Sequence, residues 1–243
     1  MIRSDKSQIL SVLKQDILRL EGFTTVNHHA VSTGLDVIKE AFPNTSFPLG
    51  CIHEFLANSL EDCAVTEGFL AGLLSSFLSK HGTLLWISAS RKLFVPSLTP
   101  FGISPERFIF IDVAKEKDVL WAMDEALKCK SIAAVVGEVK EVSFNESRRF
   151  QLAAEQSQVT GFLVRHNARK VNTTACVSRW KISTLPSEAI DTLPGIGNPR
   201  WHVELLKIRS GKPQCWDIEW TEGKFVSINQ TIPIQKEYKS KAG

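Results

Sequence analysis

The stretch FPLGCIHEFLANSLEDCAVTEGFLAGLLSSF, residues 47–77, decides the fold of this chain. A Pro-Leu-Gly turn at 48–50 leads into a short strand over 51–56, and the polar residues 57–62 form a loop. After this loop, apolar side chains recur at steps of three and four residues, which predicts a helix. These side chains are Phe69, Leu70, Leu73, Leu74 and Phe77. The stretch therefore predicts a strand, a loop and a helix in direct succession.

A loop between a strand and a helix N-terminus is a common phosphate-binding site, because free backbone N–H groups and the helix dipole meet an anion there. A working loop of this kind also needs glycines, a lysine and a Ser/Thr hydroxyl for magnesium. This chain has no glycine between residues 50 and 68 and no lysine between residues 39 and 80. Glu61 and Asp62 would repel a triphosphate. We therefore predict a P-loop-type scaffold without nucleotide chemistry.

The composition is that of an ordinary globular protein. The chain has 243 residues, of which 43% are hydrophobic and 23% charged, so it can bury a core and does not match a disordered protein. Its N-terminus is polar, and no run of 18 apolar residues occurs. These features predict a cytoplasmic protein without a membrane segment.

The cysteine spacing and the charge distribution indicate which metal sites and which kinds of partner to expect. Five cysteines are scattered without a CxxC pair or a zinc-finger spacing, so we expect reduced thiols and no metal site. They are Cys51, Cys63, Cys129, Cys176 and Cys215. Residues 165–243 carry 13 Lys/Arg against 7 Asp/Glu, whereas residues 1–164 carry 16 against 19. A basic C-terminal third is compatible with nucleic acid or an acidic partner, although a solvated face is the commoner meaning.

An amphipathic helix is predicted near the N-terminus, from Ser4 to Leu20, and a polar linker follows over 22–34. Such a helix covers its own domain or docks on another protein. The last residues are basic and polar, as is typical of a mobile tail. We therefore divide the chain into an N-terminal helix and linker (1–34), a main domain (35–228) and a flexible basic tail (229–243).

The main domain alternates between strand and helix patterns. Apolar runs typical of buried strands are 83–88, 108–111, 132–136 and 161–165. Helical patterns are 35–41, 92–101 (interrupted by two prolines), 115–129 and 144–157. In the last of these, Phe150, Leu152, Ala153 and Ala154 are expected to face inward. This alternation predicts right-handed βαβ units and a mostly parallel sheet.

After residue 169 the pattern changes to a period of two. Segments 175–183, 201–208 and 215–220 alternate between apolar and polar residues, with a Ser-Gly-Lys-Pro turn at 210–213. This predicts antiparallel strands added to the sheet. Residues 185–199, rich in Pro, Gly, Ser and Thr, are expected to form a loop.

The order of these elements resembles the RecA-type core, and several phrases resemble the ImuA family, RecA-like accessory proteins of the bacterial error-prone repair cassette. The phrases are FPLGCIHEFL, LLWIS, LWAMDEAL, AAVVGEV, SRRFQLAAE, TGFLVR, SRWKI and PRWHVELLKIRSGKPQCWDIEW, over roughly residues 43–226. The resemblance implies an α/β, RecA-like, P-loop-type three-layer fold. Its mostly parallel sheet would be extended by C-terminal antiparallel strands, and its phosphate-binding loop would be degenerate.

When the RecA-type nucleotide site is carried over onto this sequence, its four functional residues are all replaced. The phosphate-binding lysine would fall at Cys63 and the magnesium-binding hydroxyl at Ala64. The catalytic glutamate would fall near Ser90, and the magnesium-binding aspartate near Gly137, beside Glu138. Phosphoryl transfer depends on positioned cations, all of which would be missing here. The resemblance therefore implies a pseudo-ATPase with no catalytic residue and no cofactor.

The resemblance also implies a function and partners. It implies a non-catalytic adaptor in SOS-type, damage-induced, error-prone translesion synthesis. Its partners would be ImuB, a polymerase-like protein, and through it an error-prone replicative-type DNA polymerase, with RecA and DNA as further candidates. One alternative is a SulA-like cell-division inhibitor acting on a tubulin-like GTPase, although this chain is longer than SulA. Another is a residual ATPase with an unconventional loop.

Eight residues are candidate contacts with DNA or a partner: Arg148, Arg149, Arg165, Arg169, Lys170, Trp201, Trp216 and Trp220. The cations could contact phosphates with salt-sensitive affinity, or they could form intramolecular pairs with nearby glutamates. The tryptophans lie on the predicted antiparallel strands. They would pack in the core, or an exposed remainder would form an interface.

His53 and Glu54 are the most conspicuous polar pair in the first strand. As neighbours on a strand they face opposite sides of the sheet, which prevents them from acting together as a catalytic pair. We expect both to be packed polar side chains.

Overall fold

The computed structural model describes residues 12–13, 35–42, 45–77, 82–90, 93–167, 171–187 and 197–228. Apart from the helical residues Val12 and Leu13, the predicted N-terminal helix lies outside these ranges, as does the predicted tail from residue 229. Residues 188–196 of the predicted loop also lie outside them. The strands of the described ranges all lie between residues 52 and 227.

In the described ranges, nine strands form one sheet. They are β1 Ile52–Ala57, β2 Thr83–Ser88, β3 Phe108–Asp112, β4 Ile132–Val139, β5 Thr160–His166, β6 Ser178–Leu185, β7 Arg200–Ile208, β8 Gln214–Thr221 and β9 Lys224–Ser227. The longer helices are α2 Leu60–Phe77, α3 Glu116–Leu127 and α4 Phe144–Ser157. Short 3₁₀ helices are η1 Lys39–Ala41, η3 Val95–Phe101 and η4 Pro105–Arg107.

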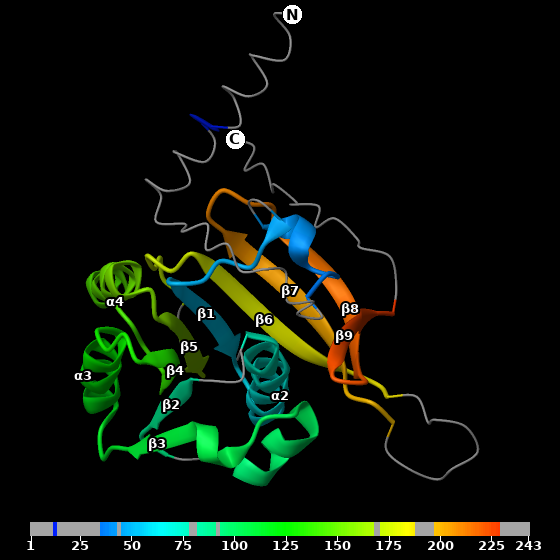
Figure 1. Ribbon diagram of the computed structural model, residues 1–243, viewed down its shortest axis with the longest axis horizontal. Helices are drawn as coiled ribbons and strands as arrows, with labels where there is room; N and C mark the ends of the chain where they lie inside the picture. Colours follow the sequence, from blue (N-terminus) through cyan, green and yellow to red (C-terminus); the bar gives the residue numbers. More distant parts are fainter. Residues whose placement is uncertain are drawn as a thin grey trace, which may run out of the picture.

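The strand order in the sheet is β3-β2-β4-β5-β1-β6-β7-β8-β9 (Figure 1). Neighbours from β3 to β6 pair in parallel. From β6 to β9 every pairing is antiparallel. The predicted mixed α/β sheet, parallel first and antiparallel towards the C-terminus, is thereby confirmed.

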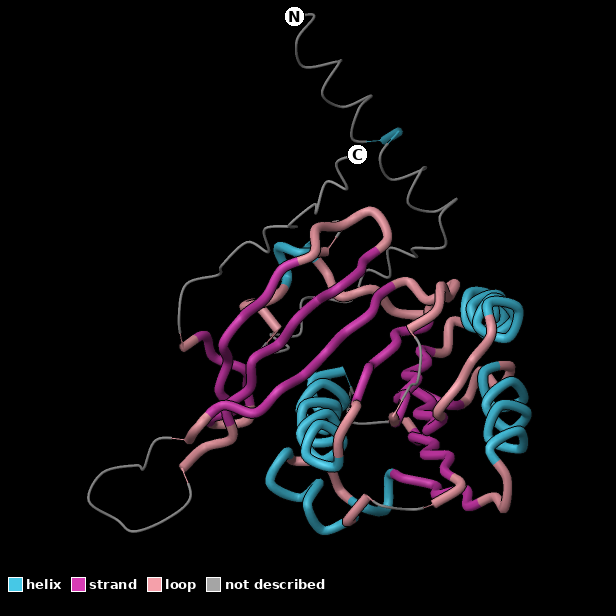
Figure 2. The backbone as a smooth tube through the Cα atoms, turned by 180° about the vertical axis from the view of Figure 1, so that it is seen from behind, coloured by secondary structure: helices cyan, strands magenta, loops and turns pink. Residues whose placement is uncertain are grey.

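The helices cover both faces of the parallel strands. Helices α3 and α4 contact one another and pack on β1, β2, β4 and β5. Helix α2 lies on the opposite face, against β1 and β6, and it also contacts η3 and β9. Figures 1 and 2, seen from opposite sides, show the antiparallel strands curving around α2. The molecule therefore has three layers, with α2 held inside the curve of the sheet.

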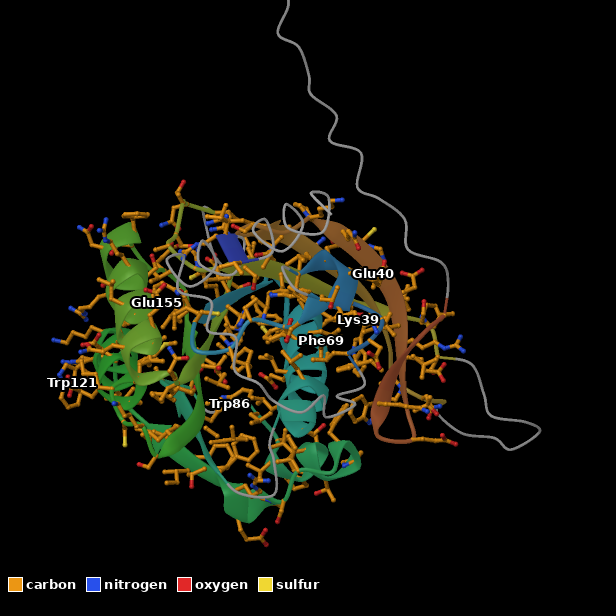
Figure 3. The ribbon with its side chains drawn as sticks, turned by 45° about the horizontal axis from the view of Figure 1, so that its top comes forward. Lys39, Glu40, Phe69, Trp86, Trp121 and Glu155 are labelled. Atoms are coloured by element: carbon orange, nitrogen blue, oxygen red, sulfur yellow. The ribbon has the colours of Figure 1, made fainter. Side chains whose placement is uncertain are left out.

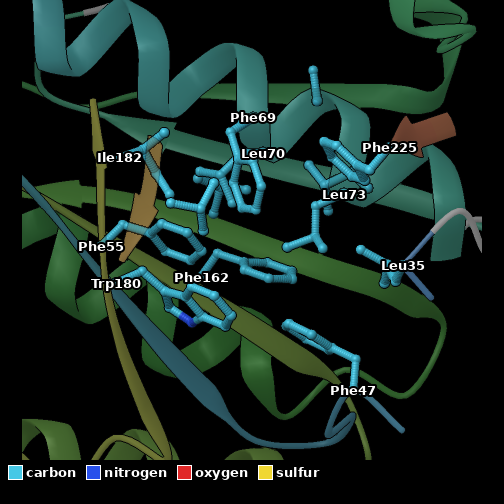
Figure 4. Packing of buried hydrophobic residues seen from close by; sticks show 14 of the residues in the cluster. Leu35, Phe47, Phe55, Phe69, Leu70, Leu73, Phe162, Trp180, Ile182 and Phe225 are labelled. Carbon is cyan, nitrogen blue, oxygen red and sulfur yellow. The ribbon is translucent and has the colours of Figure 1, made fainter. Parts of the chain in front are cut away.

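Aromatic side chains dominate the core between α2 and the sheet (Figure 4). Trp180 is fully buried, and its ring stacks on Phe55 with centroids 5.9 Å apart. Phe69 of α2 lies 6.4 Å from the same tryptophan and 5.2 Å from Phe225 of β9. Each such side chain contributes roughly 2–3 kcal/mol through burial of apolar surface. The packing joins the parallel and antiparallel parts of the sheet through one helix.

Several segments differ from the sequence-based expectation. The predicted helix over 35–41 is only the 3₁₀ helix η1, and α2 begins at Leu60, inside the predicted loop over 57–62. Strand β4 continues through Gly137 to Val139, because backbone pairing with β5 continues past the glycine. The predicted helix over 92–101 is the 3₁₀ helix η3, since its prolines lack the N–H groups of a regular α-helix. Strand β9 was not predicted. It follows a tight turn at Glu222 and Gly223, both with positive φ, where a hairpin more often has Asn-Gly.

Gly72 of α2 allows the closest approach between the helix and the antiparallel strands. A Cβ atom added there would lie 2.7 Å from Cζ of Phe225 and 3.0 Å from Cζ3 of Trp220. At Gly68, one turn earlier, an added Cβ would make only ordinary contacts at 3.7 Å. Both glycines lie in α2, but only Gly72 is tightly packed. Substituting each in turn therefore distinguishes the effect of helix propensity from the effect of packing.

We expect Gly72→Ala to lower the free energy of unfolding by about 1 kcal/mol, because overpacking costs about 1–3 kcal/mol and outweighs the gain in helix propensity. Gly68→Ala should raise it by up to about 1 kcal/mol. Urea unfolding followed by tryptophan fluorescence measures both. Equal stability of the two variants would contradict the packing described for Gly72.

Candidate functional site

The predicted phosphate loop joins β1 to α2, and the chain itself occupies its backbone donors. Oδ2 of Asp62 accepts hydrogen bonds from the backbone N–H groups of Asn58, at 3.1 Å, and Ser59, at 3.2 Å. The Ser59 hydroxyl in turn accepts from the Asp62 N–H at 3.0 Å. These bonds cap α2, where a negative charge is favourable. The carboxylate thus takes two N–H groups that an anionic ligand would need.

The four predicted positions of the degenerate nucleotide site do not form one surface. Cys63 is buried on α2, whereas Ala64 and Ser90 are exposed. Gly137 lies inside β4, where an added Cβ would come within 2.7 Å of the Met123 sulfur. An aspartate would therefore not fit at this position without displacing that side chain.

A buried polar cluster fills the space beside this loop. We define the polar cluster as Cys63, Glu67, Trp86, Ser88, Glu138 and His166. Sγ of Cys63 lies 2.8 Å from Nδ1 of His166, and Nε2 of the same ring lies 3.2 Å from Oε2 of Glu138. Trp86, labelled in Figure 3, donates its indole N–H to Oε1 of Glu138, and the Ser88 hydroxyl donates to Oε2 at 3.0 Å. Helix α2 and strands β2, β4 and β5 therefore all contribute to one polar site.

The environment of Glu138 keeps its carboxylate ionised. Burial alone would raise its pKa, but the contacts with His166, Trp86 and Ser88 outweigh burial and hold the pKa below its ordinary value. The imidazole of His166 and two hydrogen-bond donors therefore surround the carboxylate of Glu138, which follows Gly137 on β4.

Three members of the polar cluster could hold a metal ion, although the cysteine spacing led us to expect none. Glu67, Glu138 and His166 each bring one ligand atom to within 4.8 Å of the others. They come from α2, β4 and β5, so their distances along the sequence carry no metal-binding pattern. Only the fold brings them together.

A second buried polar group centres on Glu54 of β1. Arg165 of β5 donates from Nη1 to Glu54 Oε1 at 2.9 Å, and Arg179 of β6 donates from Nε to Oε2 at 2.7 Å. Thr174 adds a hydrogen bond to Oε2 at 2.8 Å. Glu54 and Arg165 are fully buried, while Glu141, which also pairs with Arg165, is half exposed. The carboxylate therefore links β1 to both of its neighbours in the sheet.

His53 points to the other face of β1 and is also buried. Its Nδ1 lies 2.6 Å from the Ser178 hydroxyl, and its Nε2 lies 2.8 Å from the Pro48 carbonyl oxygen. Burial lowers the pKa of His53 to about 4, although the Pro48 carbonyl opposes this shift. The ring is therefore neutral at pH 7, and it packs on the rings of Phe47 and Phe162.

The residues predicted to contact DNA or a partner differ in their exposure. Arg165 is buried against Glu54, and Trp201, Trp216 and Trp220 are buried in the core, so these four side chains cannot reach a ligand. The predicted role of Arg165 is corrected because its charge is needed inside the sheet. Arg148 and Arg149 are exposed on α4, and Nε of Arg149 lies 3.0 Å from Oδ1 of Asp124. Arg169 and Lys170 lie outside the described residues.

An open surface pocket of about 540 Å³ lies between α4, residues 173–176 and the end of β7. Helix α4 contributes Phe144, Arg148 and Leu152, which we call the α4 stripe, and the same helix carries Glu155 (Figure 3). Lys207 and Arg209 add cations from the other side. The pKa of Lys207 is lowered, first by burial and then by the charge of Arg179. The pocket therefore combines apolar surface with cations and one carboxylate, Glu155, whose Oε1 lies 3.6 Å from Nη1 of Arg209.

Sequence reasoning missed most of this pocket. We expected Leu152 to face inward, yet 56% of its surface is exposed, and 45% of Phe144 is exposed. Steps of four residues place Phe144, Arg148 and Leu152 on one face of α4, which is the signal that could have revealed the stripe. Lys207 and Arg209 lie far away in sequence and gave no comparable signal.

In the part of the chain that the structure describes, no helix combines the length and the apolar character needed to cross a membrane.

Comparison with known proteins identifies relatives, although no family model matches the chain. Protein ImuA from two strains of Caulobacter vibrioides is 30% identical over 215 residues, covering 84% of this chain and 88% of the relative. Cell division inhibitor SulA of Yersinia pestis is 26% identical over 153 residues, covering 63% of this chain and 88% of that protein. The crystal structure of SulA from Pseudomonas aeruginosa gives a TM-score of 0.41 at 20% identity, covering 47% of this chain and 97% of that one.

The two carboxylates that pair with Arg165 allow a matched test of its burial. We expect Glu54→Gln to lower the free energy of unfolding by about 3–5 kcal/mol, because two arginines then lack their shared buried anion. Glu141→Gln should cost less than about 1 kcal/mol, since that carboxylate is half exposed. Chemical denaturation of both variants gives the comparison. Similar losses would show that Glu54 does not carry the network.

Proposed function

Because the chain belongs to the ImuA family, we propose that it is a non-catalytic adaptor in damage-induced, error-prone DNA repair. The observation that carries this proposal is the 30% identity to Protein ImuA across 88% of that relative. Residues 35–228 would form a RecA-like domain with a degenerate P-loop-type site. Residues 1–34 and 229–243 would flank it, and the protein would work in the cytoplasm.

Several features of the β1–α2 loop support an adaptor rather than an ATPase. Asp62 occupies two loop N–H groups, and its charge opposes a phosphate at the same place. Cys63 faces His166, and Ala64 has no hydroxyl for magnesium. A nucleotide would therefore meet a negative side chain where active enzymes present a lysine and backbone donors.

The proposed partners are ImuB and, through it, an error-prone replicative-type DNA polymerase, with RecA as a further candidate. The pocket at the α4 stripe supports such a contact, because Arg148 and Lys207 would attract acidic side chains, while Arg209 already pairs with Glu155. Phe144 and Leu152 would bury apolar groups of the partner next to these charges. The surface fits an acidic segment with apolar anchors.

Direct DNA binding is a weaker part of the proposal. Arg165 is buried, and Arg149 is paired with Asp124. Arg148 is exposed and has no ion-pair partner among the described residues, but single cations give little affinity without stacking aromatic side chains. Any contact with DNA would therefore be weak and strongly dependent on salt.

A SulA-like division inhibitor is the second candidate, since the similarity to SulA covers 88% of that protein. It leaves more of this chain unmatched than the similarity to Protein ImuA does, 63% against 84% covered. The two candidates differ in the partner they would retain.

We expect the purified chain to show no binding of Mg-ATP at millimolar concentration, because Asp62 replaces the phosphate at the loop. Isothermal titration calorimetry measures this directly, with Glu138→Gln as a parallel sample. Tight binding that disappears in Glu138→Gln would instead support a residual ATPase.

We expect a tagged chain recovered from DNA-damaged cells of its own source to retain a polymerase-like protein, identified by mass spectrometry. Arg148→Glu together with Leu152→Ser should reduce this retention at least about tenfold, because one charge is reversed and an apolar anchor is lost.

Ile109→Ser is the matched control, since Ile109 is equally exposed but lies on β3, away from the pocket. It should leave retention unchanged. Recovery of a tubulin-like GTPase in place of a polymerase-like protein would favour the SulA-like alternative and overturn the adaptor.

A further inference from the structure

The ring of His166 stands between a thiol and two carboxylates. Its Nδ1 faces Sγ of Cys63 at 2.8 Å, and its Nε2 faces Oε2 of Glu138 at 3.2 Å. A carboxylate oxygen of Glu67 lies within 4.8 Å of a ring nitrogen of His166 and of a carboxylate oxygen of Glu138. The side chains are deeply buried, with exposures of 4% for Glu138, 7% for His166 and 9% for Glu67.

The Nε2 atom of His166 is buried without a hydrogen-bond partner among the described residues. It is close to Glu138, but the two atoms are not aligned for a hydrogen bond. When Nδ1 carries the ring proton and donates to Cys63, the lone pair of Nε2 faces the Glu138 carboxylate and is free to coordinate a cation.

We propose that Glu67, Glu138 and His166 bind a divalent transition metal ion, with zinc as the expected one. Two ligands of tetrahedral zinc lie about 3.3 Å apart, because each is about 2.0–2.1 Å from the ion. The 3.2 Å between Nε2 of His166 and Oε2 of Glu138 matches this separation. The third carboxylate lies near enough to close the set with a small side-chain movement.

The charge balance of the site also favours a cation. Two carboxylates brought together in a buried site repel one another, and a divalent ion removes this repulsion. Trp86 and Ser88 donate hydrogen bonds to Glu138. Sγ of Cys63 lies 2.8 Å from Nδ1, the other ring nitrogen of His166. Such outer contacts fix the orientation of metal ligands in known sites.

The ligand types favour zinc over magnesium. Magnesium prefers an octahedral set of oxygens and retains several waters, whereas an imidazole with carboxylates suits zinc. Three protein ligands leave a fourth position for water or for a donor group from elsewhere. The metal site is independent of the adaptor role, since neither nucleotide nor partner is part of it.

The direct test is the zinc content of the full chain, freed of metal with a chelator and then dialysed against micromolar zinc. We expect about one zinc per chain by plasma mass spectrometry. Glu67→Gln and His166→Gln should each retain less than about a tenth of this amount, because each removes a ligand. Circular dichroism establishes that the variants are folded.

A second measurement uses the unmodified protein, so that it does not depend on variant folding. Cobalt(II) added to the metal-free chain should produce visible absorption bands of a four-coordinate ion, and added zinc should abolish them. The melting temperature should rise with zinc and fall with chelator, because an ion that binds only the folded chain stabilises it.

Two cysteine variants serve as controls. Cys129→Ser removes an exposed thiol and should leave zinc content unchanged. Cys63→Ser should keep one zinc per chain but weaken its affinity about 10–100-fold, as expected for a positioning residue. Less than about a tenth of a zinc per unmodified chain would overturn the metal site. Zinc uptake that survives both ligand substitutions, or that is lost in Cys129→Ser, would also overturn it.

Discussion

The buried carboxylate of Glu54 is the interaction on which the sheet depends. Strand β1 lies between β5 and β6, and one side chain on β1 accepts hydrogen bonds from an arginine on each neighbour. Strand β5 belongs to the parallel part, and β6 begins the antiparallel part. The carboxylate therefore sits at the join between the two halves of the architecture. A buried anion with two guanidinium partners tolerates little change in the register of either strand.

Helix α2 also connects the two parts of the sheet, through apolar packing. It follows β1 directly, so its position is fixed at the loop where Asp62 caps it. Its far end packs under β8 and β9 through Gly72, where no other residue would let the aromatic rings approach as closely. One helix thus determines how far the antiparallel strands curve. The same helix places Cys63 and Glu67 in the polar cluster.

The sequence predicts the local parts of this structure well and the long-range parts poorly. Strand 83–88 and helix 144–157 were predicted with their observed bounds, because apolar runs and helical periodicity are local signals. The burial of Arg165 was not predictable, since its partner Glu54 lies on another strand and both residues look like surface residues in isolation. For the same reason the convergence of Glu67, Glu138 and His166 was missed. Leu152 was assigned inward because hydrophobicity alone does not distinguish a core residue from an exposed apolar anchor.

The Asp62 cap has a consequence for how such a protein is controlled. An ATPase alternates between nucleotide states, and its loop changes partners with each turnover. Here the anion in the loop is covalently part of the chain, so it neither arrives nor departs. In the proposed adaptor role, no nucleotide cycle would then time the association with a partner. That association would follow the concentrations of the two components.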